Sequence, residues 1–294
     1  MGSRDDAHDT ARPRIALAAV TTVLFVTFLD TTVVSVALGD IQRELGADVV
    51  LLQWVVNAYT VVFAGLMLAG GSLGDRWGRK RVMIVGLVVF CAGSVIAALA
   101  ASTPALIAGR AVMGVGAAAA EPGTLSVLRH IFPRERARAR AIGVWAAVSG
   151  LALAAGPVVG AALVDTYGRR SIFWFDLIIG AGALAAAAWS VPESVDPNPG
   201  PFDRAGLLLG ALFLAAVIYA ATAGADQGYT AAPVLSLFAL GAIAFAGFVA
   251  VESRARAPLL DFRYLRPPAA RSSSPSPSIS AYSRSSSSPR CICK

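Results

Sequence analysis

The sequence predicts an all-α fold, a polytopic bundle of about eight transmembrane helices, and its composition and its apolar runs both support this prediction. Hydrophobic residues make up 56% of the 294 residues and charged residues only 15%, whereas soluble domains average roughly 45–50% and about 25%. A helix rises about 1.5 Å per residue, so roughly 20 apolar residues are needed to cross a bilayer. Eight runs of about that length occur along the chain.

The first of these runs needs a separate argument, because it follows a polar, Arg-containing start as the core of a secretory signal would. It is too long for a signal, contains Asp30 and precedes further runs, so we interpret it as a retained first helix. Lipid offers no partner for backbone N–H and C=O groups, so all the runs must be helical and their connections must lie at or beyond the interface. The runs lie at about 15–38, 50–72, 82–101, 104–127, 139–164, 171–191, 205–223 and 233–251.

Because successive spans cross the membrane in opposite directions, their connections alternate between its two sides, and most Lys and Arg residues lie on one of these sides. A net charge of +7 would suggest a nucleic-acid partner for a soluble protein. Here seventeen Lys and Arg residues fall on the side of the N-terminus and three, namely Arg43, Arg169 and Arg170, on the other. Under the positive-inside rule this asymmetry predicts that both termini are cytoplasmic. We therefore expect the partner of the basic residues to be a lipid bilayer and no nucleic acid.

The stretch GSLGDRWGRKR, residues 71–81, is predicted to be a short cytoplasmic loop between the second and third helices. Orientation explains its cations but not its glycines at 71, 74 and 78, nor Asp75. Glycines suit a tight turn in which two helix ends approach closely, and the positive N-terminus of the third helix would stabilise an anion at Asp75. We therefore expect a loop of fixed geometry.

This loop resembles the signature between the second and third helices of the major facilitator superfamily. Two further segments, LDTTVVSVALGDIQREL (29–45) and QWVVNAY (53–59), resemble the first two helices of its fourteen-helix drug/proton antiporter branch. Ser35 stands where Asn is usual there, and Gly39 where Pro is usual. RAVMGVGAA (110–118) is similar to the Arg-containing segment of the fourth helix, with Met113 in place of Gln.

The resemblance continues in the next two helices. SGLALAAGPVVGAALVD (149–165) resembles the Gly-Pro pattern of the fifth helix that marks antiporters within the superfamily. RRSIFWFDLIIG (169–180) resembles the entry to the sixth helix, with Asp176 in place of the usual Asn and Ile178 in place of Pro. PFDRAGLLL (201–209) and ESRARAPLLDFRYLR (252–266) resemble the start of the seventh helix and the segment after the eighth.

Beyond residue 266 the resemblance stops, because residues 267–294 are rich in Ser, Pro and Arg and cannot form a span. The resemblance implies a major-facilitator-like N-terminal six-helix half plus two additional helices, whereas a full member carries six more. The predicted segments are a cytoplasmic N-terminus (1–14), the six-helix half (15–191), a cytoplasmic linker (192–204), two additional helices (205–251), a cytoplasmic segment (252–266) and a disordered tail (267–294).

Ionisable residues inside the spans are the candidates for chemistry, since each costs about 2.5–3.5 kcal/mol at a helix centre on insertion scales. Asp30 lies about two-thirds of the way along the first helix, where it either snorkels to the interface or faces a central cavity. Arg110 and Glu121 are eleven residues apart, so on one continuous helix they share a stripe about 16 Å long. A carboxylate that is charged in water and neutral when desolvated holds either a proton or a cationic substrate. Asp30 and Arg110 are therefore our first-choice pair, and Glu121 either faces the cavity on the same stripe as Arg110 or lies near the cytoplasmic end of its span.

The predicted site residues form three groups. The first is a proton-coupling and substrate cavity, in which the second helix supplies polar groups beside an aromatic interface anchor, Trp54. The second is a loop that the resemblance implies to be a gate gripping the opposite half of the transporter. The third is a helix motif whose alternative is ordinary close packing of small residues. The cavity group consists of Asp30, Arg110, Glu121, Gln53, Asn57 and Tyr59. The gating loop consists of Gly71, Gly74, Asp75, Arg76, Gly78, Arg79 and Lys80. The helix motif consists of Gly150, Gly156, Pro157 and Gly160.

The resemblance implies a secondary transporter of the plasma membrane that exports drugs or antibiotics, amphipathic small molecules, in exchange for protons. The sequence has no GxxxxGK[ST] loop, so an ion gradient rather than ATP would supply energy. No nucleophile–base–orienter set or metal cluster is evident, so we expect no enzyme, no cofactor and no metal. The alternative is a truncated or frameshifted, non-transporting fragment of such an antiporter. A third interpretation is a half-transporter that works as a homodimer.

Overall fold

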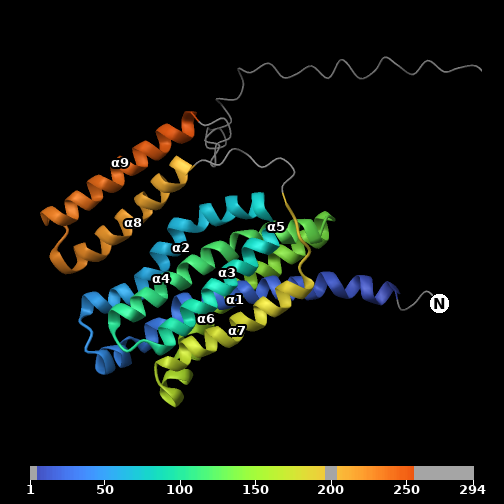
Figure 1. Ribbon diagram of the computed structural model, residues 1–294, viewed down its shortest axis with the longest axis horizontal. Helices are drawn as coiled ribbons and strands as arrows, with labels where there is room; N and C mark the ends of the chain where they lie inside the picture. The colour runs from blue at the N-terminus through green and yellow to red at the C-terminus, as the bar shows by residue number, and fades with distance from the viewer. Residues whose placement is uncertain (1–4, 196–203, 255–294) are drawn as a thin grey trace, which may run out of the picture. The chain divides into compact units, whose positions relative to one another are not determined.

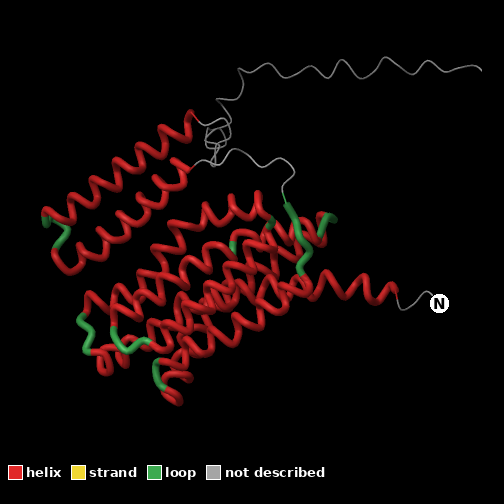
Figure 2. The backbone as a smooth tube through the Cα atoms, viewed as in Figure 1, coloured by secondary structure: helices red, strands yellow, loops and turns green. Residues whose placement is uncertain are grey.

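The computed structural model describes residues 5–195 and 204–254, and these residues form helices joined by short connections (Figures 1 and 2). Eight segments within the described residues are long and apolar enough to cross a membrane, which confirms the predicted fold class. The helices are α1 (Asp5–Leu45), α2 (Val49–Trp77), α3 (Arg79–Leu99), α4 (Thr103–Ala120), α5 (Pro122–Ile131), α6 (Glu135–Tyr167), α7 (Arg170–Ser190), α8 (Arg204–Gln227) and α9 (Ala232–Arg254).

The fourth span is not the single continuous helix that the stripe argument assumed. Helix α4 ends at Ala120 and α5 begins at Pro122, with Glu121 between them. Proline has no N–H to donate and its ring crowds the preceding turn, so the backbone hydrogen-bond ladder is interrupted there. The segment Thr103–Ile131 still has the length and composition of one membrane span. The prediction of one span is confirmed, whereas that of one unbroken helix is wrong.

The predicted loop at 71–81 is almost entirely helical. Helix α2 continues to Trp77 and α3 begins at Arg79, so Gly78 alone separates them. Its φ of 106° lies in the region that favours glycine, which makes this one-residue turn feasible. The expected tight turn therefore exists, but Gly71, Gly74 and Asp75 belong to the last turns of α2 rather than to a loop.

Close helix contacts in the bundle are made where glycines face a neighbouring backbone. At Gly86 and Gly116 a Cβ atom would collide with the facing helix, which explains how α3 and α4 pack together. Helix α1 packs against α6 and α7, and α2 packs against α4. Arranged in this way, α1 and α4 bring the ionisable residues of two different spans into the same interior.

Two clusters of buried apolar side chains fill the interior of the bundle. One cluster surrounds Leu29, Phe90, Met113 and Phe173, which come from α1, α3, α4 and α7. The other lies nearer the N-terminal end of α1 and includes Val20 and Leu128. Helices α8 and α9 pack against each other as a hairpin. The predicted tail at 267–294 lies outside the described residues.

Candidate functional site

The centre of the candidate site is an ion pair between Asp30 of α1 and Arg110 of α4. Nη1 of Arg110 lies 2.5 Å from Oδ1 and 2.6 Å from Oδ2 of Asp30. Both side chains have an exposed fraction of 0%. The first-choice pair of the sequence analysis thus meets, across 80 residues of chain. Both groups are buried inside the bundle, so the interpretation in which Asp30 snorkels to the interface does not fit the structure.

Helix α2 supplies the other contacts of the Arg110 guanidinium. Its Nε donates to the backbone carbonyl oxygen of Val55 at 3.1 Å. Its Cζ lies 4.6 Å from the centroid of the Tyr59 ring, a distance at which an aromatic face attracts a cation. The Tyr59 hydroxyl donates to the carbonyl oxygen of Thr27 at 3.0 Å and so ties α2 to α1. Arg110 is therefore held by two helices besides its own: α1 through Asp30, and α2 through Val55 and Tyr59. The Tyr59–Thr27 hydrogen bond links these two helices.

A second aspartate, Asp176 of α7, lies in the same interior and was not selected from the sequence as a site residue. It is fully buried and is in electrostatic contact with both Asp30 and Arg110. Within the part of the chain that the structure describes, neither of its carboxyl oxygens has a hydrogen-bond donor. The signal for it in the sequence is that an aspartate stands where the resemblance leads one to expect Asn.

Glu121 is buried at the junction of α4 and α5 and faces α1. The hydroxyl of Thr27 lies 3.4 Å from its Oε2, within hydrogen-bonding distance. Thr27 and Asp30 are three residues apart on α1, so they lie on one face of that helix. Glu121 and Arg110 thus both contact this face of α1, as the predicted stripe required, although α4 ends between them.

The three polar residues predicted on α2 have different environments. Tyr59 belongs to the Arg110 cluster. Asn57 donates to the hydroxyl of Thr222 on α8 at 2.7 Å, and Trp54 contacts the ring of Tyr219 on the same helix. Among the described residues Gln53 has no partner for its carbonyl oxygen, which is buried. Only one of the three predicted groups is therefore seen beside Asp30 and Arg110.

Two of the residues predicted to form the gate, Asp75 and Arg79, form an ion pair with each other. Oδ1 of Asp75 accepts from Nε and Nη2 of Arg79 at 3.0 and 2.7 Å, across the Gly78 turn. The segment after α7 reaches the same turn: Glu193 accepts from the backbone N–H of Lys80 at 3.2 Å and lies 3.6 Å from Arg81. The turn between α2 and α3 is therefore held by the segment that follows α7.

The predicted antiporter motif on α6 is divided between two faces of the helix. Gly156 and Gly160 are buried against Thr32 and Val33 of α1, where a Cβ atom would collide with α1. Gly150 and Pro157 are exposed on the other face. The small residues therefore allow α6 to approach α1 within one turn of Asp30.

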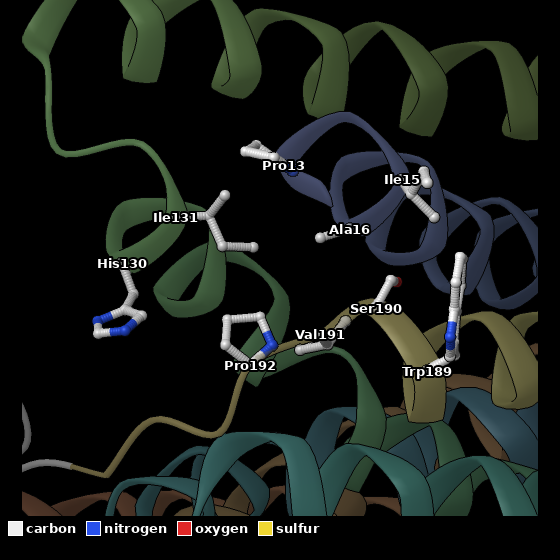
Figure 3. A pocket seen from close by; sticks show the side chains of 9 residues that line it. All are labelled: Pro13, Ile15, Ala16, His130, Ile131, Trp189, Ser190, Val191 and Pro192. Carbon is white, nitrogen blue, oxygen red and sulfur yellow. The ribbon is translucent and has the colours of Figure 1, made fainter. Parts of the chain in front are cut away.

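A pocket of about 510 Å³ opens at one end of the bundle, between the start of α1 and the ends of α5 and α7 (Figure 3). Its lining is mostly apolar, and His130 is the titratable residue that Figure 3 shows there. Ala16 in this pocket precedes Asp30 by fourteen residues of the same helix, or about 21 Å at 1.5 Å per residue. The pocket is thus separate from the ionisable cluster.

Comparisons with known proteins agree with this architecture. The model of the Major Facilitator Superfamily matches residues 20–255. The chain is similar to the multidrug efflux pump LfrA of Mycolicibacterium smegmatis, with 35% identity over 88% of this chain and 51% of the relative. It is also similar to the methylenomycin A resistance protein of Bacillus subtilis, with 39% identity over 79% of this chain and 50% of the relative. The chain spans about half the length of these relatives.

Solved structures show the same fold at low sequence identity. The peptide transporter POT in complex with sulfate matches with a TM-score of 0.61 and 18% identity, covering 83% of this chain and 53% of the transporter. The human organic anion transporter MFSD10 matches with a TM-score of 0.52 and 16% identity, covering 80% and 71%. Likeness at these identities shows the fold alone, and it is the family match that agrees with the expectation of a transporter rather than an enzyme. From its family match, its relatives and its fold, this chain is a multi-pass membrane protein that belongs to the Major Facilitator Superfamily.

Proposed function

We propose that this chain provides the N-terminal half of a plasma-membrane antiporter that exports amphipathic drugs or antibiotics in exchange for protons. The observation that carries the proposal is the Asp30–Arg110 pair, fully buried within two membrane spans. Charges at this depth are expensive and usually mark ion or substrate pathways. The names of the relatives, which include an efflux pump and a resistance protein, support export as the direction of transport.

The buried pair is suited to coupling because its attraction depends on the protonation of Asp30. While the carboxylate is ionised it holds Arg110 at 2.5 Å; once it is neutral, most of that attraction is lost and α1 and α4 are released from each other. Helix α6 lies directly against α1 at Gly156 and Gly160, so a shift of α1 is passed to a second helix. Proton binding and helix movement are linked in this way.

Efflux of a fluorescent cationic dye from bacteria that produce the chain tests the proposal. We expect export that stops when a protonophore collapses the gradient. Asp30→Asn and Arg110→Ala should each abolish export at normal membrane levels. Asp165→Asn is the matched control, because Asp165 is exposed near the end of α6 and export should be unchanged. Export that survives Asp30→Asn, or that is unaffected by the protonophore, contradicts the proposal, and a chain that is inserted at normal levels but exports no dye rejects export by this half alone.

Orientation is a separate part of the proposal, in which both termini are cytoplasmic. The support is the excess of Lys and Arg at the connections on the N-terminal side. In a variant without native cysteines, Tyr167→Cys and Trp77→Cys place thiols at exposed positions at opposite ends of the bundle. An impermeant thiol reagent should label Tyr167→Cys in intact cells and Trp77→Cys only after permeabilisation. The reverse pattern would contradict the orientation.

A further inference from the structure

Among the described residues, the buried cluster around Asp30 contains two aspartates, Asp30 and Asp176, but one arginine, Arg110. Asp30 and Asp176 are fully buried, and Arg110 is in electrostatic contact with both. If both acids were ionised, this cluster would carry one net negative charge shielded from solvent. An uncompensated charge in an apolar interior is so costly that the group takes up a proton instead.

The contacts decide which acid is ionised. Nη1 of Arg110 approaches both oxygens of Asp30, at 2.5 and 2.6 Å, which is the arrangement of an ionised carboxylate with its cation. Asp176 receives no donor from any residue that the structure describes. A buried carboxylate without any donor is not a stable arrangement, whereas a protonated carboxyl has its own O–H to donate.

An acceptor for that O–H is present. Helices α1 and α7 pack together, and the Asp30 carboxyl interacts with that of Asp176. The other titratable groups near Asp176 are Tyr59 of α2 and Cys91 of α3. The Tyr59 hydroxyl already donates to a backbone carbonyl, and a thiol is a weak donor. Two adjacent carboxyl groups that cannot both ionise share one proton. In this pair the protonated carboxyl of Asp176 is the donor and the ionised carboxylate of Asp30 is the acceptor.

We propose that Asp176 holds a proton which it shares with Asp30, and that this proton, rather than one on Asp30 alone, is exchanged for a cationic substrate. The proposal rests on the proposed function for its exchange step. The proton leaves Asp176 for water, so that two carboxylates face one guanidinium. The resulting single negative charge matches the amine or other cationic group of an amphipathic substrate. Nη2 of Arg110, which lacks a partner among the described residues, is the donor available to Asp176 in that state.

This proposal assigns a role to a departure from the family pattern. The usual Asn at this position can neither gain nor lose a proton, whereas Asp176 can. The substitution Asp176→Asn therefore restores the usual residue with almost unchanged volume. It removes the titrating group while keeping a polar side chain that can donate to Asp30, so it should leave the bundle folded.

Infrared spectroscopy of the purified chain in lipid measures the proton directly, without transport. At about pH 7 exposed Asp and Glu are ionised, so a protonated carboxyl gives an isolated C=O band that shifts in heavy water. We expect this band in the natural chain and in Asp176→Glu, and its loss in Asp176→Asn. Asp30→Asn should also abolish it, because Arg110 is then free to pair with Asp176. All spectra are compared in a Glu121→Gln background, which removes the other buried acid, and the matched control Asp165→Asn should leave the band unchanged.

The outcomes separate this inference from the proposed function. A band that survives in Asp176→Asn assigns the proton to another acid and overturns the inference, and so does a band unaffected by Asp30→Asn. Dye efflux without the band likewise overturns the inference and leaves the proposed function intact. The band without efflux upholds the protonated pair and rejects export by this half alone. Helical circular dichroism of each variant verifies that the loss of a band is not a loss of structure.

Discussion

The chain contains two Asp–Arg pairs of nearly equal length in very different surroundings. Asp30 and Arg110 are 2.5 Å apart with exposed fractions of 0% for both side chains, whereas Asp75 and Arg79 are 2.7 Å apart with 43% and 18%. The first pair joins two membrane spans, and the second joins the ends of consecutive helices at a turn. The two distances are nearly equal, so a difference in the contribution of each pair to the free energy of unfolding must come from the exposure of the pair to water.

Water acts on the two pairs in opposite ways. At the turn, water already solvates both charges, so the pair adds about 0.2–1 kcal/mol and removing one partner leaves the other solvated. In the interior, forming the pair first requires dehydration of both groups, so its net contribution to stability is small or negative. Removing one partner there is nevertheless expensive, because the other stays buried without compensation. Exposure rather than distance therefore predicts the effect of mutation.

The largest expected effect comes from breaking the buried pair. Arg110→Leu removes the cation beside Asp30 and Asp176 and also the donor to Val55, so we expect a loss of about 3–5 kcal/mol in the free energy of unfolding in detergent micelles. Arg140→Leu is the matched control, because Arg140 is exposed, and its effect should stay within about 0.5 kcal/mol.

The double variant Asp30→Asn with Arg110→Leu sharpens this result. If the cost of Arg110→Leu arises from an uncompensated carboxylate, neutralising that carboxylate should recover a large part of it. Equal and additive losses in the double variant would mean that the two charges contribute independently. The buried pair would then behave like the exposed pair, in which removing one partner does not leave the other uncompensated, and burial would not explain the cost of mutation.

The pairing of Asp30 with Arg110 is also the part of the site that sequence reasoning predicted best. Ionisable residues inside apolar runs are few and must find one another, so the choice of partners was small. The eight spans were predictable for a similar reason, since bilayer thickness fixes run length. Both predictions follow from the cost of exposing polar groups to lipid, which is readable in one sequence.

Features that depend on which face of a helix packs against which neighbouring helix were not predictable in this way. Asp176 was overlooked because nothing in a single sequence shows that α7 turns it toward Asp30. Asn57 has the composition of a cavity residue, yet it contacts Thr222 of α8. The charged segment 71–81 was predicted to be a loop, although helix α2 needs only Gly78 to end. Periodicity predicts elements, whereas tertiary neighbours decide what their side chains do.

The second effect in size concerns the uncharged contact that places α1. Gly160→Val introduces a branched side chain where a Cβ atom would lie 2.8 Å from the carbonyl oxygen of Val33, so we expect a loss of about 1–3 kcal/mol from overpacking. Gly150→Val on the same helix is the matched control, because no described atom lies within 4 Å of a Cβ there. A comparable loss at both positions would mean that helix propensity, not the α1–α6 contact, sets the cost.

A smaller effect is expected at the turn that carries the exposed pair. Gly78→Ala forces a residue with a Cβ to adopt a φ of 106°, so we expect a loss of about 1–2 kcal/mol in the free energy of unfolding. Gly143→Ala is the control, since Gly143 lies within α6 with free space around it and alanine is the better helix former. Equal effects at the two positions would show that the turn does not need glycine.

The smallest effect tests the exposed pair itself. Asp75→Asn removes the charge that accepts from Arg79 but leaves both side chains in contact with water, so we expect a loss of about 0.2–1 kcal/mol. The loss should shrink further in concentrated salt, because screening weakens attraction between exposed charges. Asp40→Asn breaks the comparable exposed pair with Arg43 on α1 and should behave alike. A loss of several kcal/mol at Asp75 alone, insensitive to salt, would place it with the buried acids and remove the distinction by exposure. A small loss would leave this turn free to be remade during transport at little energetic cost, whereas the interior pair can exchange partners only when a proton or a cation compensates.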